Sequence, residues 1–139
     1  MSIRSFGLFR AVATLVVLSL ATAPAAMADS SGIVVVKMEG MNGSGESGTA
    51  TLKPSGNKTI VVIKLSGGSS VEQPAHFHTG TCDKYEPRPL YGLNDVVNGA
   101  STTTVNQPID KLTAGNLIIN VHKSYDDIAT QTSCGVAKP

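Results

Sequence analysis

Short runs of β-branched residues, each closed by a turn, recur along the chain. Residues 58–65, KTIVVIKL, form the strongest run, and SGGSS breaks it directly afterwards. Such runs predict β-strands rather than helices. Further strands are predicted at residues 33–36, 49–53, 101–105 and 117–122, and only residues 126–130 show a weak helical period. Many short strands with Gly- or Pro-bearing turns predict an all-β fold, a Greek-key β-sandwich or barrel.

The strand predicted at residues 58–65 has apolar side chains on both faces. Ile60 and Val62 lie on the face opposite to that of Val61 and Ile63. This pattern is typical of a central strand covered on both sides. A self-association surface is the alternative, which leaves a homodimer open.

Residues 1–28 have the order of a secretory signal peptide. Arg4 and Arg10 give a positive start, residues 11–23 are apolar, and AAMA follows, so cleavage is expected after Ala28. A membrane anchor is the alternative, but the apolar run is too short to span a bilayer comfortably.

Cleavage there leaves a single domain of 111 residues, 29–139. Loss of the two arginines leaves nine Lys and Arg against ten Asp and Glu, a net charge of −1 without a basic run, which argues against nucleic acid as a partner. We expect a secreted or periplasmic protein of a bacterial envelope, with no stable membrane insertion after cleavage.

Cys82 and Cys134 are the only cysteines. An even count in an exported chain predicts one disulfide. It would close a loop of about fifty residues, worth roughly 4 kcal/mol in the chain-entropy model. Two free thiols or two soft metal ligands are the alternatives.

Two of the three histidines lie in the segment PAHFHTGTC, residues 74–82. Residues two apart in a strand point to the same side. The apolar Ala75 and Phe77 should therefore face the core, which turns His76 and His78 outward together. Two rings on neighbouring positions of one face can converge on one ion.

The third histidine has an equivalent position in the strand LIINVH, residues 117–122. Ile119 and Val121 should face inward, so Asn120 and His122 share the outer face. Three imidazoles on the solvent side of neighbouring strands suit copper or zinc and leave a coordination position open. Solvated histidines without a metal are the alternative.

Several of these segments resemble the copper/zinc superoxide dismutases. His76-Phe77-His78, followed by Gly80 and Cys82, resembles their copper-binding H-x-H strand with its nearby disulfide cysteine. The segment NVHKSYDD, residues 120–127, is similar to their V-H-x-x-x-D-D segment, and CGV, residues 134–136, to their closing strand. GESGTATL, residues 45–52, together with PAHFHTGTC, is similar to chordin-type (CHRD) domains of bacterial envelope proteins.

The resemblance implies an eight-stranded Greek-key sandwich with a copper site. The implied ligands are His76, His78 and His122. Asp126 would hydrogen-bond a ligand ring and fix its tautomer. Cys82 and Cys134 would form the disulfide that holds a loop against the last strand.

The chain also departs from the dismutases. No histidine occurs between His78 and His122, so the bridging histidine and the zinc-site histidines are absent. Gln131 occupies the position of the substrate-guiding arginine, and Arg88 is the nearest candidate for a replacement charge. The departures favour an exported copper-binding protein, although three histidines would also serve zinc. A copper-only superoxide dismutase and a non-catalytic CHRD-type interaction module are the alternatives.

Overall fold

The computed structural model describes residues 32–139, which form an almost entirely β-stranded domain. The strands within this range are β1 (Val34–Gly40), β2 (Ser47–Ser55), β3 (Lys58–Ser66), β4 (Gln73–Thr79), β5 (Tyr91–Val96), β6 (Ala100–Val105), β7 (Leu117–His122) and β8 (Gln131–Val136). A single-turn helix, α1 (Ile109–Leu112), precedes β7. The predicted all-β fold is confirmed, whereas the predicted signal peptide lies outside the described residues.

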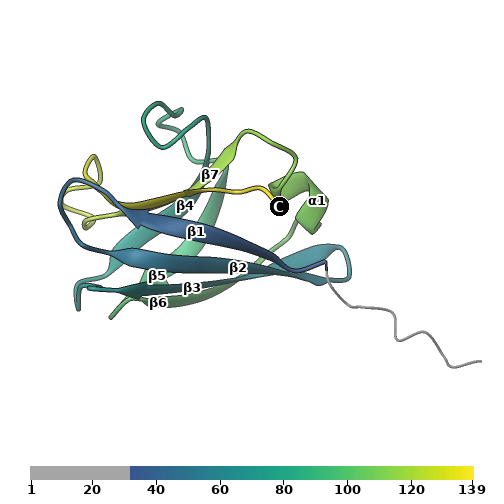
Figure 1. The fold of residues 1–139 in the computed structure, drawn as a ribbon, viewed down its shortest axis with the longest axis horizontal. Coiled ribbons are helices and arrows are strands. Elements are labelled where there is room, and N and C mark those ends of the chain that lie inside the picture. The colour runs from purple at the N-terminus through teal and green to yellow at the C-terminus, as the bar shows by residue number, and fades with distance from the viewer. Residues whose placement is uncertain (1–31) are drawn as a thin grey trace, which may run out of the picture.

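The eight strands form one antiparallel sheet in the order β5-β4-β7-β8-β1-β2-β3-β6, which curls into a nearly closed barrel. Neighbours such as β4 and β7, or β3 and β6, are not consecutive in sequence, so connections cross the barrel ends as in a Greek key. In Figure 1, strands β1 to β3 cross in front of β4 and β7. Among residues 32–139, no helix has the length and apolar character needed to cross a membrane.

The barrel is closed between β5 and β6 by side chains rather than by a backbone ladder. The backbone N–H of Asn94 donates to the Thr103 hydroxyl at 2.8 Å, and its side-chain amide donates to the Thr102 carbonyl at 2.7 Å. The Ser101 hydroxyl donates to the Asn94 carbonyl at 2.8 Å. One asparagine and its hydroxyl-bearing neighbours therefore join the two edges of the sheet.

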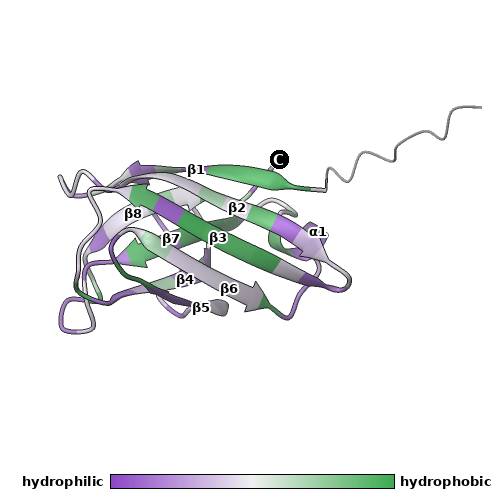
Figure 2. Ribbon diagram, turned by 90° about the horizontal axis from the view of Figure 1, so that it is seen from below, coloured by the Kyte–Doolittle hydropathy of each residue, from purple (hydrophilic) through white to green (hydrophobic). Residues whose placement is uncertain are grey.

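The core is aliphatic with one central aromatic ring, Phe77, which is fully buried. Figure 2 shows β3 as a largely hydrophobic strand between the paler β2 and β6. Its inward residues Val61 and Ile63 are buried, whereas Ile60 and Val62 on the other face are half-buried.

The sequence prediction misses one strand and one helix. Residues 79–99 look irregular in sequence but contain β5, which pairs with β4 on one side only. Asn98 and Gly99, with φ of 51° and 75°, make the tight turn from β5 to β6, as expected of an Asn-Gly pair. The helix indicated by the weak helical period at residues 126–130 is wrong, because these residues form turns. The short helix α1 is not predicted from the sequence.

Candidate metal centre

Strand β4 presents its two histidines on the face away from the core. Ala75 and Phe77 are fully buried in the core, as alternation predicts. His76 and His78 point to the other side, but that side is not open to solvent. His78 is only 1% exposed and His76 is half-buried, so the predicted solvent exposure is wrong.

Strand β7 places the third histidine beside them. β7 pairs antiparallel with β4, with Val121 opposite Ala75, so His122 lies one step beyond, diagonal to His76. His122 is 3% exposed. The histidines are covered because the loops after β4 and after β7 fold over this face of the sheet.

The three rings meet at one point. One donor nitrogen from each of His76, His78 and His122 lies within 4.8 Å of the other two. The ring centroids are 5.2 to 5.7 Å apart. An ion with metal–nitrogen bonds of about 2.0 Å holds tetrahedral ligands about 3.3 Å apart, so the rings need to close by about 1.5 Å at most. The predicted grouping is confirmed, and the cluster could hold a metal ion.

A cavity of about 370 Å³ lies beside the three imidazoles. Its walls are mainly apolar, and among the residues described no charged side chain lines it; its lining is His76, His78, His122, Tyr85, Pro87, Pro89, Ile128 and Ala129. The Tyr85 ring packs edge-on against His78, with centroids 4.9 Å apart. Arg88 lies between the two lining prolines but is exposed.

The loop between β4 and β5 is fixed to the sheet by the disulfide. Cys82 in this loop is bonded to Cys134 in β8, with a Cα–Cα distance of 5.9 Å. The Gln131 side-chain amide also donates to the Cys82 carbonyl, at 3.3 Å. The predicted disulfide is confirmed, which removes the alternatives of free thiols and of cysteine metal ligands.

The same loop orients one of the histidines. His78 Nδ1 lies 2.8 Å from the Glu86 carbonyl oxygen. A carbonyl only accepts, so Nδ1 carries the proton and donates, which leaves the Nε2 lone pair free. Nε2 is buried, has no hydrogen-bond partner in the described part of the chain, and is available to an ion. A backbone group from the loop thus supplies the tautomer control that metal sites usually need.

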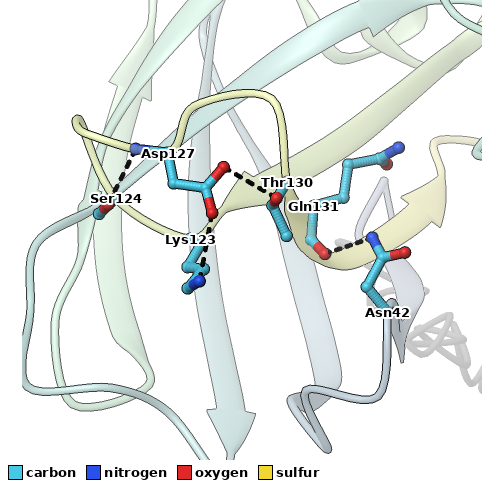
Figure 3. Close-up of polar contacts among 6 residues, drawn as sticks. All are labelled: Asn42, Lys123, Ser124, Asp127, Thr130 and Gln131. Atoms are coloured by element: carbon cyan, nitrogen blue, oxygen red, sulfur yellow. Dashed lines mark hydrogen bonds and ion pairs between the residues drawn. The ribbon is translucent and has the colours of Figure 1, made fainter.

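The loop between β7 and β8 is held by Asp127 (Figure 3). The Thr130 hydroxyl donates to Asp127 at 2.8 Å, and the Lys123 ammonium pairs with it at 3.2 Å. The Asp127 backbone N–H donates to the Ser124 hydroxyl. Asp126 is exposed and makes no hydrogen bond to a histidine in the described part of the chain. The structure therefore does not bring Asp126 to the rings, and the neighbouring carboxylate braces the loop instead.

The imidazoles are neutral at physiological pH. Burial lowers the pKa of His76 and of His78 below 6.5. Burial, reinforced by repulsion from His76 and His78, lowers the pKa of His122 to about 4. A neutral imidazole has the free lone pair that a metal requires, so the site is ready for an ion without first losing protons.

Sequence reasoning missed two contributors to this site, namely Tyr85 and Glu86. Both lie in a loop whose course no strand pattern predicts.

Comparison with protein-family models finds no match for this chain, and comparison with curated proteins finds none either.

Proposed function

We propose that this chain is an exported copper-binding protein that holds the ion with His76, His78 and His122. The observation that carries the proposal is the convergence of three ring nitrogens, one from each histidine, within 4.8 Å. Neutral rings, a fixed tautomer at His78 and a buried location are the conditions under which imidazoles bind metals tightly.

Copper is preferred to zinc for two reasons. Divalent copper binds nitrogen donors more strongly than zinc does in the general order of affinities. The resemblance of the segments around the three histidines to copper/zinc superoxide dismutases supports the same metal and a common origin with that family. The disulfide fits a chain that is exported to an oxidising compartment.

Copper titration tests the proposal. His76→Ala and His122→Ala are each expected to weaken copper binding by more than about 100-fold, because one of three ligands is lost. Lys53→Ala, an exposed change on β2, is the matched control and should bind like the wild type. Calorimetry with Cu²⁺ and Zn²⁺ gives the affinities and the metal preference. Equal binding by the histidine variants and the wild type would leave the non-catalytic interaction module as the function.

A copper-only superoxide dismutase is the second candidate, and the cavity beside the rings favours it because a small molecule can reach the ion. Efficient dismutation also needs a positive field that draws in the anion. Since no charged side chain of residues 32–139 lines this cavity, the copper-loaded protein is expected to dismute superoxide no faster per ion than free aqueous copper. A pulse-radiolysis or cytochrome-reduction assay measures this rate, and a much faster rate would make the protein an enzyme.

A further inference from the structure

Eight buried side-chain polar atoms lack a hydrogen-bond partner within residues 32–139, and six of them belong to one group of neighbouring residues. Four are ring nitrogens of His76, His78 and His122, and the other two are both amide atoms of Asn120. An ion bound by the rings accounts for one nitrogen of each histidine. Among residues 32–139 it leaves the second nitrogen of His122 and both amide atoms of Asn120 unexplained. Burying an amide with neither atom paired destabilises a protein.

Asn120 is a strand neighbour of all three histidines. On β7 it stands directly opposite His76 of β4, diagonal to His78, and two residues before His122 on the same face. Its cross-strand neighbour on the other side is Cys134 of the disulfide. Directly opposed residues in an antiparallel pair have Cβ atoms about 4.5–5.5 Å apart, so the amide is within reach of the space that the rings enclose.

Packing alone does not require an amide here. Ile118, the preceding residue on this face of β7, is buried as completely as Asn120, and both are 0% exposed. An aliphatic side chain is therefore accommodated on this face of β7. Asparagine in place of an aliphatic residue indicates that the amide has a partner of its own.

We propose that the Oδ1 atom of Asn120 is a fourth protein donor to the ion held by the three histidines. The inference rests on the proposed function. The amide approaches from the sheet, and the cavity lies beside the rings, so the ion keeps an open side. An amide oxygen is a harder donor than imidazole, and it favours Cu²⁺ over Cu⁺.

Asn120→Leu tests this assignment, because leucine has the same number of side-chain heavy atoms, branched at the same position, and no donor atom. The variant is expected to bind Cu²⁺ at least about tenfold more weakly than the wild type, with Cu⁺ affinity changed far less. The electron paramagnetic resonance spectrum of the Cu²⁺ form should change as an oxygen donor is lost. An unchanged spectrum with unchanged Cu²⁺ affinity would overturn the proposal.

The metal-free variant gives an independent readout. Removal of an unpaired buried amide is expected to raise the melting temperature of metal-free Asn120→Leu above that of the metal-free wild type. If the amide instead served an internal hydrogen bond, the variant would melt lower and bind Cu²⁺ normally, which contradicts the proposal. Weaker Cu²⁺ binding by Asn120→Leu, together with a higher melting temperature of its metal-free form, would identify Asn120 as a ligand.

Asn120→Asp keeps an oxygen at the same place and adds a negative charge. It is expected to bind Cu²⁺ at least as tightly as the wild type, so it keeps the test decisive if the leucine variant does not fold. If the aspartate variant lost Cu²⁺ affinity although it folds, the assignment would be wrong. Absence of Cu²⁺ binding by the wild type would remove the proposed function itself, whereas binding that is indifferent to residue 120 would remove only this inference.

Discussion

Replacing Cys82 and Cys134 together by alanine is expected to lower the free energy of unfolding by about 4 kcal/mol, in the chain-entropy model. The two residues are 52 apart in sequence, so the bond removes much of the freedom of the unfolded chain. Chemical denaturation of the oxidised wild type and the double variant, without metal, measures the difference. Unfolding curves that coincide would contradict the prediction.

The same change should weaken copper binding by tenfold or more. The disulfide fixes the loop that carries Glu86, whose carbonyl sets the tautomer of His78, and loss of such a partner costs about 10- to 100-fold in metal affinity. Leu52→Ala is the matched control, since it destabilises the core by about 2–5 kcal/mol without touching the loop. If this control lost copper affinity to the same extent, the coupling would be through global stability and not through the loop.

Acidification is expected to destabilise the metal-free protein by up to about 3 kcal/mol through His122. In the unfolded chain this imidazole takes up a proton near its ordinary pKa of 6.5, whereas in the fold burial keeps its pKa at about 4. The unfolded state therefore binds more protons between these values. Stability is full above pH 6.5, falls as the pH drops toward 4, and loses nothing further from this group below that. His76 and His78 shift in the same direction.

Urea unfolding at pH 7 and pH 4.5 measures this effect. His122→Gln removes the titrating group, so its stability should depend less steeply on pH than that of the wild type. If both proteins lost equal stability over this range, protonation of His122 would not be the cause. Saturating copper should reduce the loss in the wild type, because the ion competes with the proton for the same lone pair.

Much of the sheet could be predicted from alternation alone. The strand at residues 117–122 was predicted with its observed bounds, because its inward residues Ile119 and Val121 are apolar and β-branched. The strand β5 was missed because its sequence, YGLNDV, contains Gly, Asn and Asp, which are rare in strands. The pair Asn98-Gly99 was the available signal for the hairpin, since it favours the turn in which both residues have positive φ.

The sequence predicts which face of each strand carries the histidines, but it does not predict that the three rings are buried together. Alternation places His76 and His78 on one side of a strand, yet it says nothing about which loop covers that side. The cover depends on where Cys82 is tethered, which is a long-range contact. The choice between Asp126 and Asp127 depends on the dihedral angles of one turn, and adjacent carboxylates in a turn are not distinguishable by pattern.

The hydrogen bonds that join Asn94 of β5 to residues 101–103 of β6 have a consequence for the solubility of the protein. An open sheet has two free edges, whose backbone N–H and C=O groups can pair with another chain. In this barrel the bonds around Asn94 hold the two edge strands, β5 and β6, against each other and make them less accessible to another chain. Protection against edge-to-edge aggregation in this barrel therefore depends on a few hydroxyl and amide groups. Two of these bonds use backbone atoms of Asn94, so replacement of Ser101 and Thr103 by alanine, rather than a change at residue 94, would remove them. That double change would expose β5 and β6 as templates for misassembly, even though the hydrophobic interior would be untouched.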